Sequence, residues 1–212
     1  MTALDQWLKE RQSGIGGSDA SAVIGCNPWR TNQELYDLKT GQAAVPEILN
    51  EEAVKYGLAA EAPLRELFAL DYPRYEVYHA EYEIHRHAEY PFLLGTYDGI
   101  LTDKETGERG ILEIKTTTIT KSMLWEKWND KVPQNYFVQV LHYLLVSGFS
   151  FAILCAQLKT EWGDGVRKII RHYEFRRADH EADIEYLKNA EIDFWQNNVL
   201  KRVRPALILP QI

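Results

Sequence analysis

The sequence predicts an α/β (α+β) fold in which helices flank a central β-sheet. Residues 93–118 contain two apolar segments joined by a charged turn with Gly107, which is the pattern of a buried β-hairpin. Two more apolar segments, residues 150–158 and 166–175, flank a Trp-Gly-Asp-Gly turn and predict another pair of strands. A further strand is expected over residues 75–84, and further helices over residues 2–11, 31–39, 121–131 and 179–200.

The composition is that of a folded globular protein. With 212 residues, of which 45% are hydrophobic, the chain is expected to form a single domain over residues 1–212. No apolar run reaches the roughly 20 residues that cross a bilayer, and the N-terminus lacks the apolar core of a signal peptide. Two isolated cysteines, Cys26 and Cys155, fit a reducing compartment, so we expect a cytoplasmic protein without a membrane partner.

The predicted hairpin brings three charged side chains together. If Asp103 pairs with Glu108 across the turn, Asp98 lies opposite Glu113, and directly paired residues share one face of an antiparallel sheet. Lys115 is two residues further along the strand, so it shares that face. The sequence therefore predicts two carboxylates and one lysine on one side of an otherwise apolar sheet.

Two carboxylates this close repel each other, and apolar surroundings raise the cost. A divalent cation removes the conflict, and oxygen ligands suit magnesium. Magnesium beside a lysine favours chemistry at a phosphate. The alternative is a surface hairpin in which Asp98 belongs to a turn and Glu113 and Lys115 form a solvated pair.

A second candidate site is the glycine-rich segment 11–19. Its glycines let backbone amides approach a ligand closely, and Ser18 or Asp19 can cap a helix over residues 20–24. The N-terminus of a helix favours phosphate, and an arginine is its natural charged partner. The alternative is a loop and helix cap that bind no ligand. The candidate phosphate contacts are Arg11, Gly16, Gly17 and Ser18.

Two predicted helices carry further candidates. Residues 51–70 are expected to form either a kinked helix or two short helices, because Pro63 removes a backbone hydrogen bond, and Glu61 lies at that break. Residues 133–146 predict a helix with an apolar core face. Its polar stripe consists of Tyr136, Gln139 and Tyr143. In isolation, Glu61 reads as a solvated charge and Gln139 as a bridging polar residue.

The net charge of −7 argues against a generally basic nucleic-acid-binding surface, but it allows a local basic groove. The positively charged candidates are Arg167, Lys168, Arg171, Arg176, Arg177, Lys201, Arg202 and Arg204. Such clusters are most often solvated faces, but they are also where a DNA path is expected. The apolar tail, residues 206–210, is expected to pack on the domain or on a neighbour.

Four blocks of the sequence together suggest a family. They are residues 11–19 with the following Ala-Ser-Ala-Val-Ile-Gly, residues 57–61, Asp98 with the Glu-Ile-Lys of residues 113–115, and residues 136–143. In this order and spacing, the chain resembles the phage-type alkaline exonucleases, the YqaJ-like viral recombinase group that includes lambda exonuclease. These proteins lie within the PD-(D/E)XK, or restriction-endonuclease-like, nuclease superfamily. One departure is that Thr96 and Tyr97, rather than the usual proline, precede the first aspartate.

The resemblance implies a restriction-endonuclease-like core with a central mixed β-sheet. It also implies a magnesium-dependent exonuclease, with manganese as a possible substitute, that digests one strand of linear double-stranded DNA from 5′ to 3′. The remaining 3′ single strand would serve a single-strand annealing protein in phage-type homologous recombination. A ring-shaped homotrimer around the duplex is implied as well, in a bacterial cell with a phage or prophage gene.

The resemblance also implies roles for single residues. Asp98 would bridge two metal ions, Glu113 and the Ile114 carbonyl would complete one of them, and Glu61 would help to hold the second. Lys115 would orient the attacking water, and Gln139 would position that water or the adjacent phosphate. Arg11, Gly16, Gly17 and Ser18 would contact the 5′-phosphate, and Tyr136 and Tyr143 would flank the DNA.

Two other functions stay open. One is an endonuclease of the same superfamily, including the CRISPR-adaptation nucleases, although those typically need clustered cysteines. The other is a non-catalytic module that binds DNA ends. The intact set of Glu61, Asp98, Glu113 and Lys115 argues against loss of catalysis.

Overall fold

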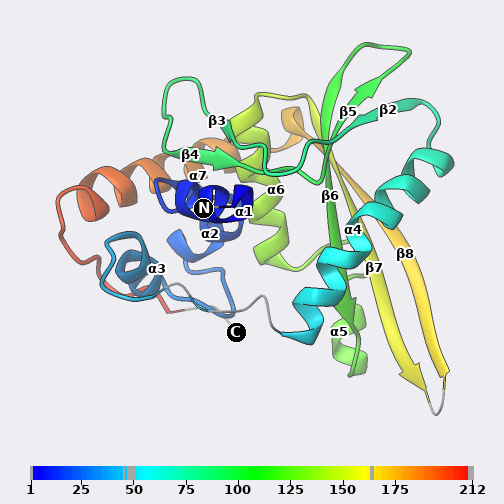
Figure 1. The fold of residues 1–212 in the computed structure, drawn as a ribbon, viewed down its shortest axis with the longest axis horizontal. Coiled ribbons are helices and arrows are strands. Elements are labelled where there is room, and N and C mark those ends of the chain that lie inside the picture. The colour runs from blue at the N-terminus through cyan, green and yellow to red at the C-terminus, as the bar shows by residue number, and fades with distance from the viewer. Residues whose placement is uncertain (1, 45, 47–50, 163–164, 210–212) are drawn as a thin grey trace.

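A mixed five-stranded β-sheet forms the centre of the molecule (Figure 1). The computed structural model describes residues 2–44, 46, 51–162 and 165–209. The strands, in spatial order, are β2 (Tyr75–Tyr78), β5 (Gly99–Asp103), β6 (Arg109–Thr118), β7 (Phe151–Trp162) and β8 (Gly165–Arg176). β6 and β7 run parallel, and the other neighbours are antiparallel. The predicted fold class, a mixed sheet flanked by helices, is confirmed.

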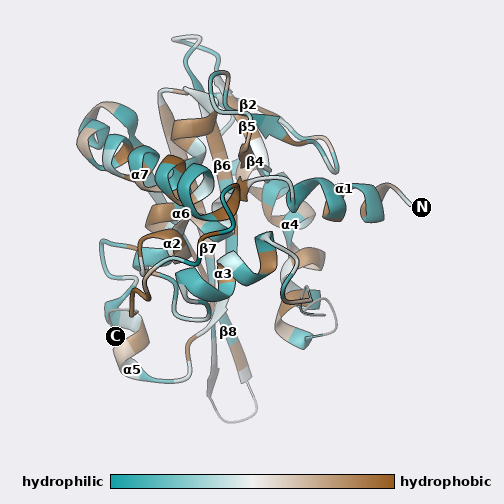
Figure 2. Cartoon of the chain, turned by 90° about the vertical axis from the view of Figure 1, so that its left-hand side faces the viewer, coloured by the Kyte–Doolittle hydropathy of each residue, from teal (hydrophilic) through white to brown (hydrophobic). Residues whose placement is uncertain are grey.

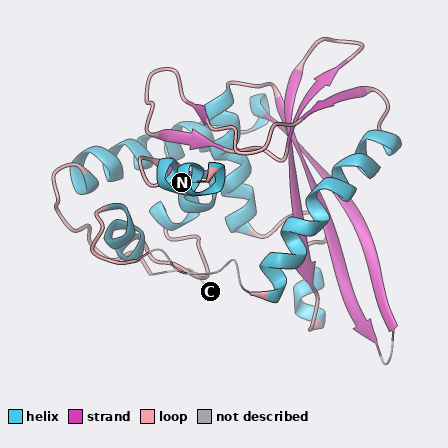
Figure 3. Cartoon of the chain, viewed as in Figure 1, coloured by secondary structure: helices cyan, strands magenta, loops and turns pink. Residues whose placement is uncertain are grey.

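Helices cover both faces of this sheet, as Figure 3 shows. On one face lies α6 (Gln134–Ser147), with α2 (Gly17–Val23) and α7 (Glu181–Asp193) packed against it. On the other face lies α4 (Glu52–Asp71). Alternate residues of a strand point to opposite faces, so β6 contributes Ile111 to the α6 side and Leu112 to the α4 side.

The hairpin between β5 and β6 has the register expected from its turn. The Asp103 N–H donates to the Glu108 carbonyl at 2.9 Å, and Gly107 has a φ of 73°, which favours glycine. The ladder ends where Gly99 lies opposite Leu112. Asp98 is therefore the first residue beyond the last pair.

A second, three-stranded sheet corrects the expected hairpin. Residues 93–95 do not continue into β5 but form β4 (Leu93–Gly95), which pairs with β1 (Ile15–Gly16) and β3 (His85–Arg86). β1 runs parallel to β4. This pairing brings the glycine-rich segment next to the strand that leads to Asp98.

Three further α-helices are α1 (Ala3–Arg11), α3 (Asn32–Lys39) and α5 (Ser122–Glu126). α1 has no buried residue and is largely hydrophilic (teal) in Figure 2. The C-terminal tail was expected to pack either on the domain or on a neighbour, and its backbone is bound to the domain. The Asn32 side chain donates to the Ala206 carbonyl at 2.7 Å and accepts from the Ile208 N–H at 3.0 Å. Pro210 lies outside the described residues.

Several predicted boundaries were wrong for local reasons. α2 begins at Gly17 and not at residue 20. Asp19 is the third residue of this helix, and its Oδ2 accepts the N–H of the N-cap residue Gly16 at 3.2 Å. Of the two forms expected around Pro63, two short helices are excluded, because α4 is one continuous helix through this proline. Leu64 and Phe68 follow Pro63 and lie four residues apart, so they share one face of the helix. Both are buried in the same core, which holds the helix on the sheet.

Other elements are shorter than expected. β2 ends at Tyr78, and α5 ends at Glu126, ahead of Asp130 with its positive φ of 52°. The last helix is divided into a 3₁₀ turn (Arg177–Asp179), α7 and a π-helix (Phe194–Val199). The expected turn between β7 and β8 falls on residues 163–164, which lie outside the described residues.

Candidate active site

Asp98 lies where the β5–β6 ladder stops. Its Oδ2 accepts the backbone N–H of Ile114 at 2.7 Å. The side chain thus takes the place of the β5 carbonyl that would bind this N–H if the ladder continued. Because N–H and C=O of one strand residue point to the same side, the Ile114 carbonyl also faces the Asp98 side. The backbone thus offers one carbonyl oxygen beside this carboxylate.

Glu113 is the most deeply buried of the candidate acids, with 2% of its surface exposed. Its Oε1 accepts from Gln139 Nε2 at 2.7 Å and pairs with Lys115 Nζ at 2.5 Å. Its Oε2 is buried and has no hydrogen-bond partner among the described residues. Burial first, and the negative charge of Asp98 second, raise the pKa of Glu113 to about 8. A proton relieves this conflict in the metal-free protein, and a cation at Oε2 would relieve it when the acid is ionised.

Glu61 reaches the same electrostatic environment from α4. Burial, and then the charge of Asp98, raise the pKa of Glu61 to about 7, although Lys115 opposes the shift. One helical turn later, Arg65 donates from Nη1 to the Asp98 backbone carbonyl at 2.9 Å, which ties α4 to the start of β5. Sequence reasoning missed Arg65, although its spacing of four residues from Glu61 on a predicted helix was a usable signal.

These carboxylates do not form a closed metal cage by themselves. Within the described ranges, no three His, Cys, Asp or Glu side chains are gathered so as to hold a metal ion. The oxygen donors of Asp98, Glu113 and Ile114, with water in the remaining positions, nevertheless match magnesium, which keeps several waters and binds through one or two carboxylates. The buried, unpartnered Oε2 of Glu113 supports this fit.

The polar stripe of α6 lies against the acids. Gln139 donates to both Glu113 and the Tyr143 hydroxyl, the latter at 3.0 Å. Tyr136 presents its ring 5.3 Å from Lys115 Nζ. Burial disfavours the charged form of Lys115, but the carboxylates of Glu113 and Asp98 outweigh it, so the pKa of Lys115 is raised. The lysine is therefore a cation at every physiological pH.

The glycine-rich segment joins this site through a close contact. A Cβ atom on Gly17 would lie 2.4 Å from Tyr143 Cε1, so only glycine fits between α2 and α6 here. At the start of the segment, Arg11 Nη2 donates to Ser18 Oγ at 3.3 Å. The Gly16 N–H is already donated to Asp19. The structure thus brings Arg11 and Ser18 together, next to a loop that packs on the helix with Gln139.

A buried ion network behind this loop was not expected from the sequence. Lys39 Nζ lies 2.8 Å from Asp19 Oδ2 and donates to the Arg11 carbonyl at 3.0 Å. Arg30 Nη1 reaches Asp19 Oδ1 at 3.3 Å. Although burial acts to raise it, the pKa of Asp19 is lowered, chiefly by Lys39. Lys39 therefore fastens both ends of the loop, and no local pattern could have indicated this.

Three of the arginines expected to contact DNA form ion pairs with acidic side chains of the protein. Arg176 pairs with Glu108 and Glu174, Arg177 with Glu181, and Arg204 with Asp37. These three arginines stabilise the protein's own elements, so their charge is largely compensated. Arg171 donates to the Trp128 carbonyl at 2.5 Å and has no ion-pair partner in the part of the chain that the structure describes.

The chain matches a known protein family. Residues 6–150 match the YqaJ-like viral recombinase domain, which is more than half of the chain. The chain belongs to this family. The YqaJ-like chain is also 37% identical over 208 residues to the uncharacterized protein YqaJ of Bacillus subtilis (strain 168). The match covers 96% of this chain and 59% of that protein, so the chain spans about three fifths of its relative's length.

Solved structures share the fold of this YqaJ-like chain. The alkaline exonuclease LHK-Exo of Laribacter hongkongensis matches with a TM-score of 0.65 at 17% identity, over 93% of this chain and 96% of that one. The same protein in complex with dAMP gives 0.64 at 16% identity, with the same coverage. A phage-related exonuclease from Haemophilus somnus 129PT gives 0.55 at 12% identity, over 89% and 96%. These structures share the predicted mixed α/β fold with a mixed sheet flanked by helices.

None of the helices described here has the length and the apolar character that a membrane span requires.

Proposed function

We propose that this YqaJ-like chain is a magnesium-dependent exonuclease that digests linear double-stranded DNA from 5′ to 3′ and leaves 3′ single-stranded tails. The observation that carries the proposal is the meeting of Asp98, Glu113 and Lys115 at the start of β5, with Glu113 Oε2 buried and without a hydrogen-bond partner among the described residues. Membership of a viral recombinase family supports it. So does the likeness to two proteins described as exonucleases, one of them also seen with dAMP.

The oxygen donors define where divalent metal would bind. Asp98, Glu113 and the Ile114 carbonyl would hold one ion, and Glu61 would help to hold a second or its waters. Metal dependence is general in this exonuclease family, and manganese would substitute for magnesium because both accept carboxylate and carbonyl ligands. When bound, such an ion polarises the phosphate and lowers the pKa of an attacking water.

The other side chains prepare the reacting groups. Lys115 is charged and pairs directly with Glu113 at 2.5 Å, which leaves its other N–H groups free to orient an attacking water and to offset negative charge that develops on the phosphate oxygens. Gln139 holds Glu113 by one N–H and is itself held by Tyr143. The carboxylate therefore keeps one orientation while the phosphodiester bond breaks.

The loop of Arg11 would select the DNA end. A 5′-terminal phosphate carries more charge than an internal diester and has oxygens free for bidentate capture by a guanidinium. Arg11 and Ser18 would bind it at the N-terminal end of α2, with Gly16 and Gly17 shaping the loop. Tyr136 would line the path of the strand beside Gln139. Tyr143 was expected to contact DNA as well, but it is buried in the core, so it would act only through its hydroxyl on Gln139.

Assembly and context complete the proposal. A chain with a net charge of −7 stays on DNA only through a local or topological hold, and a closed ring supplies one. We therefore expect a homotrimer around the duplex, with a mass of about three chains by light scattering. Its products would pass to a single-strand annealing protein in phage-type recombination in the bacterial cytoplasm.

Three substrates test the activity and its polarity: linear duplex labelled at the 5′ end, the same duplex labelled at the 3′ end, and covalently closed circular duplex. With magnesium, the proposed enzyme releases the 5′ label first and leaves the circle intact. Cutting of the circle would instead support an endonuclease of the same superfamily. Binding of ends with no cleavage in magnesium or manganese would indicate a non-catalytic end-binding module.

A further inference from the structure

A cavity lies at the far end of the strand that carries the active site. Its volume is about 410 Å³, and its lining residues are Thr118, Ile119, Thr120, Lys121, Ser122, Trp125 and Thr160. The described residues of its lining include no carboxylate. An indole, an ammonium and several hydroxyls form a set of groups that suits a nucleotide, which offers a base face, a phosphate and hydrogen-bonding edges.

The indole is held in a fixed place by its surroundings. Trp125 is partly buried, and the Arg171 guanidinium lies over its ring at 5.5 Å. Arg171 is in turn fixed by its hydrogen bond to the Trp128 carbonyl and lines a neighbouring cavity of about 490 Å³. A rigid aromatic ring with an arginine beside it is a stacking platform that needs little ordering when a base binds.

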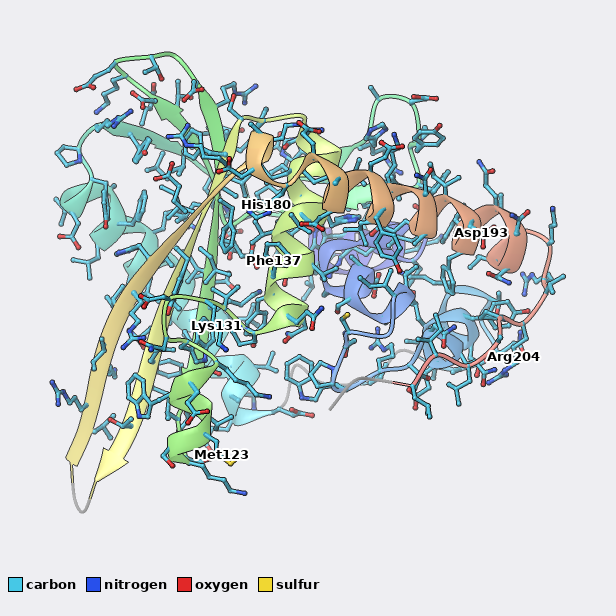
Figure 4. The ribbon with its side chains drawn as sticks, turned by 180° about the vertical axis from the view of Figure 1, so that it is seen from behind. Met123, Lys131, Phe137, His180, Asp193 and Arg204 are labelled. Atoms are coloured by element: carbon cyan, nitrogen blue, oxygen red, sulfur yellow. The ribbon has the colours of Figure 1, made fainter. Side chains whose placement is uncertain are left out.

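The cavity continues the active site along the chain of β6. Ile119, which lines the cavity, follows Lys115 by four residues, so it has the same strand parity and lies about 13 Å away at roughly 3.3 Å per extended residue. Figures 1 and 4 both place α5, which carries Trp125 and the labelled Met123, beside the ends of β6 and β7 that lie away from the β5–β6 turn. Met123 is 70% exposed, so the cavity opens beside a solvent-facing helix. A few nucleotides of DNA bridge this distance.

We propose that this cavity binds an unpaired nucleotide of DNA, with Trp125 stacking on the base and Lys121 contacting the phosphate. The assignment rests on the proposed nuclease function and adds a binding subsite to it. The nucleotide is unpaired because the faces of bases inside a duplex are covered by their neighbours, whereas a single strand leaves them open to aromatic side chains. The occupant is therefore the strand that has separated from its complement near Lys115.

Binding of a fluorescein-labelled single-stranded oligonucleotide of about 12 bases to the full chain, measured by anisotropy in EDTA, tests this assignment without cleavage. Replacing Trp125 by Ala should weaken binding about tenfold, because one base–aromatic stack is lost. Lys121→Gln should weaken binding and reduce the slope of log K against log salt by about 0.7, the loss of one single-strand phosphate contact. Trp125→Phe should retain most of the affinity, which separates stacking from misfolding.

Matched controls come from the same chain. Trp29→Ala removes an indole that is 73% exposed, and Lys104→Gln removes an exposed lysine near the β5–β6 turn. Both should bind single strands like the unchanged protein. The assignment is overturned if Trp125→Ala and Lys121→Gln bind single strands like these controls. It is also overturned if the two substitutions weaken binding of blunt duplex as much as binding of the single strand.

The result also separates this assignment from the proposed function. If the unchanged protein digests linear duplex with magnesium but Trp125→Ala binds single strands normally, only the subsite is wrong. If the unchanged protein neither digests DNA nor binds it, the proposed function itself fails.

Discussion

Replacing Glu113 by Gln should make the metal-free protein more stable at neutral pH. The folded state raises the pKa of Glu113 from 4.5 to about 8, so between these values it holds a proton that the unfolded chain releases. Stability is therefore lost as pH rises through this window. At about 1.4 kcal/mol per pH unit, the loss from pH 4.5 to pH 7 is about 3 kcal/mol.

Glutamine copies the shape of the protonated acid but cannot ionise. It keeps a carbonyl oxygen for Gln139 and Lys115, which contact Glu113 Oε1. Below the pKa of about 8, Glu113 is uncharged in the folded protein, so its neighbours Asp98 and Lys115 face an uncharged group in both proteins. The contributions of more distant titratable groups cancel in the difference. The stability advantage of Glu113→Gln should thus be small at pH 5 and grow to about 3 kcal/mol at pH 7.

Urea unfolding at 25 °C in EDTA, at pH 5, 6, 7 and 8, measures this difference. Magnesium should then stabilise the unchanged protein at pH 8, because the ion binds the ionised carboxylate, and should leave Glu113→Gln unaffected. A stability difference that does not change with pH would refute the account, because it would mean that Glu113 ionises as it does in the unfolded chain.

Three further substitutions test the glycine-rich loop. Arg11→Ala should slow digestion of 5′-phosphorylated duplex sharply and that of 5′-hydroxyl duplex little, in a comparison of both enzymes on both ends; equal losses would make Arg11 a general backbone contact. Gly17→Ala should cost about 1–3 kcal/mol in thermal unfolding, since its Cβ would lie 2.4 Å from Tyr143 Cε1, whereas the control Gly16→Ala meets nothing nearer than 3.7 Å. Lys39→Met should lower the free energy of unfolding by about 3 kcal/mol, because the buried Asp19 carboxylate keeps only its ion pair with Arg30. Lys104→Met is the control, and equal stability of the two variants would exclude a structural role for the buried lysine.

The parts of the site that follow from a fixed period could be predicted from the sequence. The turn between Asp103 and Glu108 fixes the hairpin register, and the period of two along a strand then sets Asp98, Glu113 and Lys115 on one face. The helical period of 3.6 likewise groups the polar stripe of α6. In these cases local geometry decides which side chains meet.

The missed features depend on contacts that no local pattern encodes. β1 and β3 have two residues each, too few to show any periodicity. The ammonium of Lys39 meets Asp19 only because α3 folds back onto the loop. Likewise, Arg204 was expected on DNA but pairs with Asp37, 167 residues away along the chain.

The central claim is that Asp98 and Glu113 form a metal-dependent centre that hydrolyses DNA. Its most direct test is the rate of nucleotide release from linear duplex by the unchanged protein and by Asp98→Ala, each with magnesium and with EDTA. We predict release only by the unchanged protein with magnesium, while Asp98→Ala stays folded. Equal rates for the two proteins in magnesium would contradict the assignment of this site.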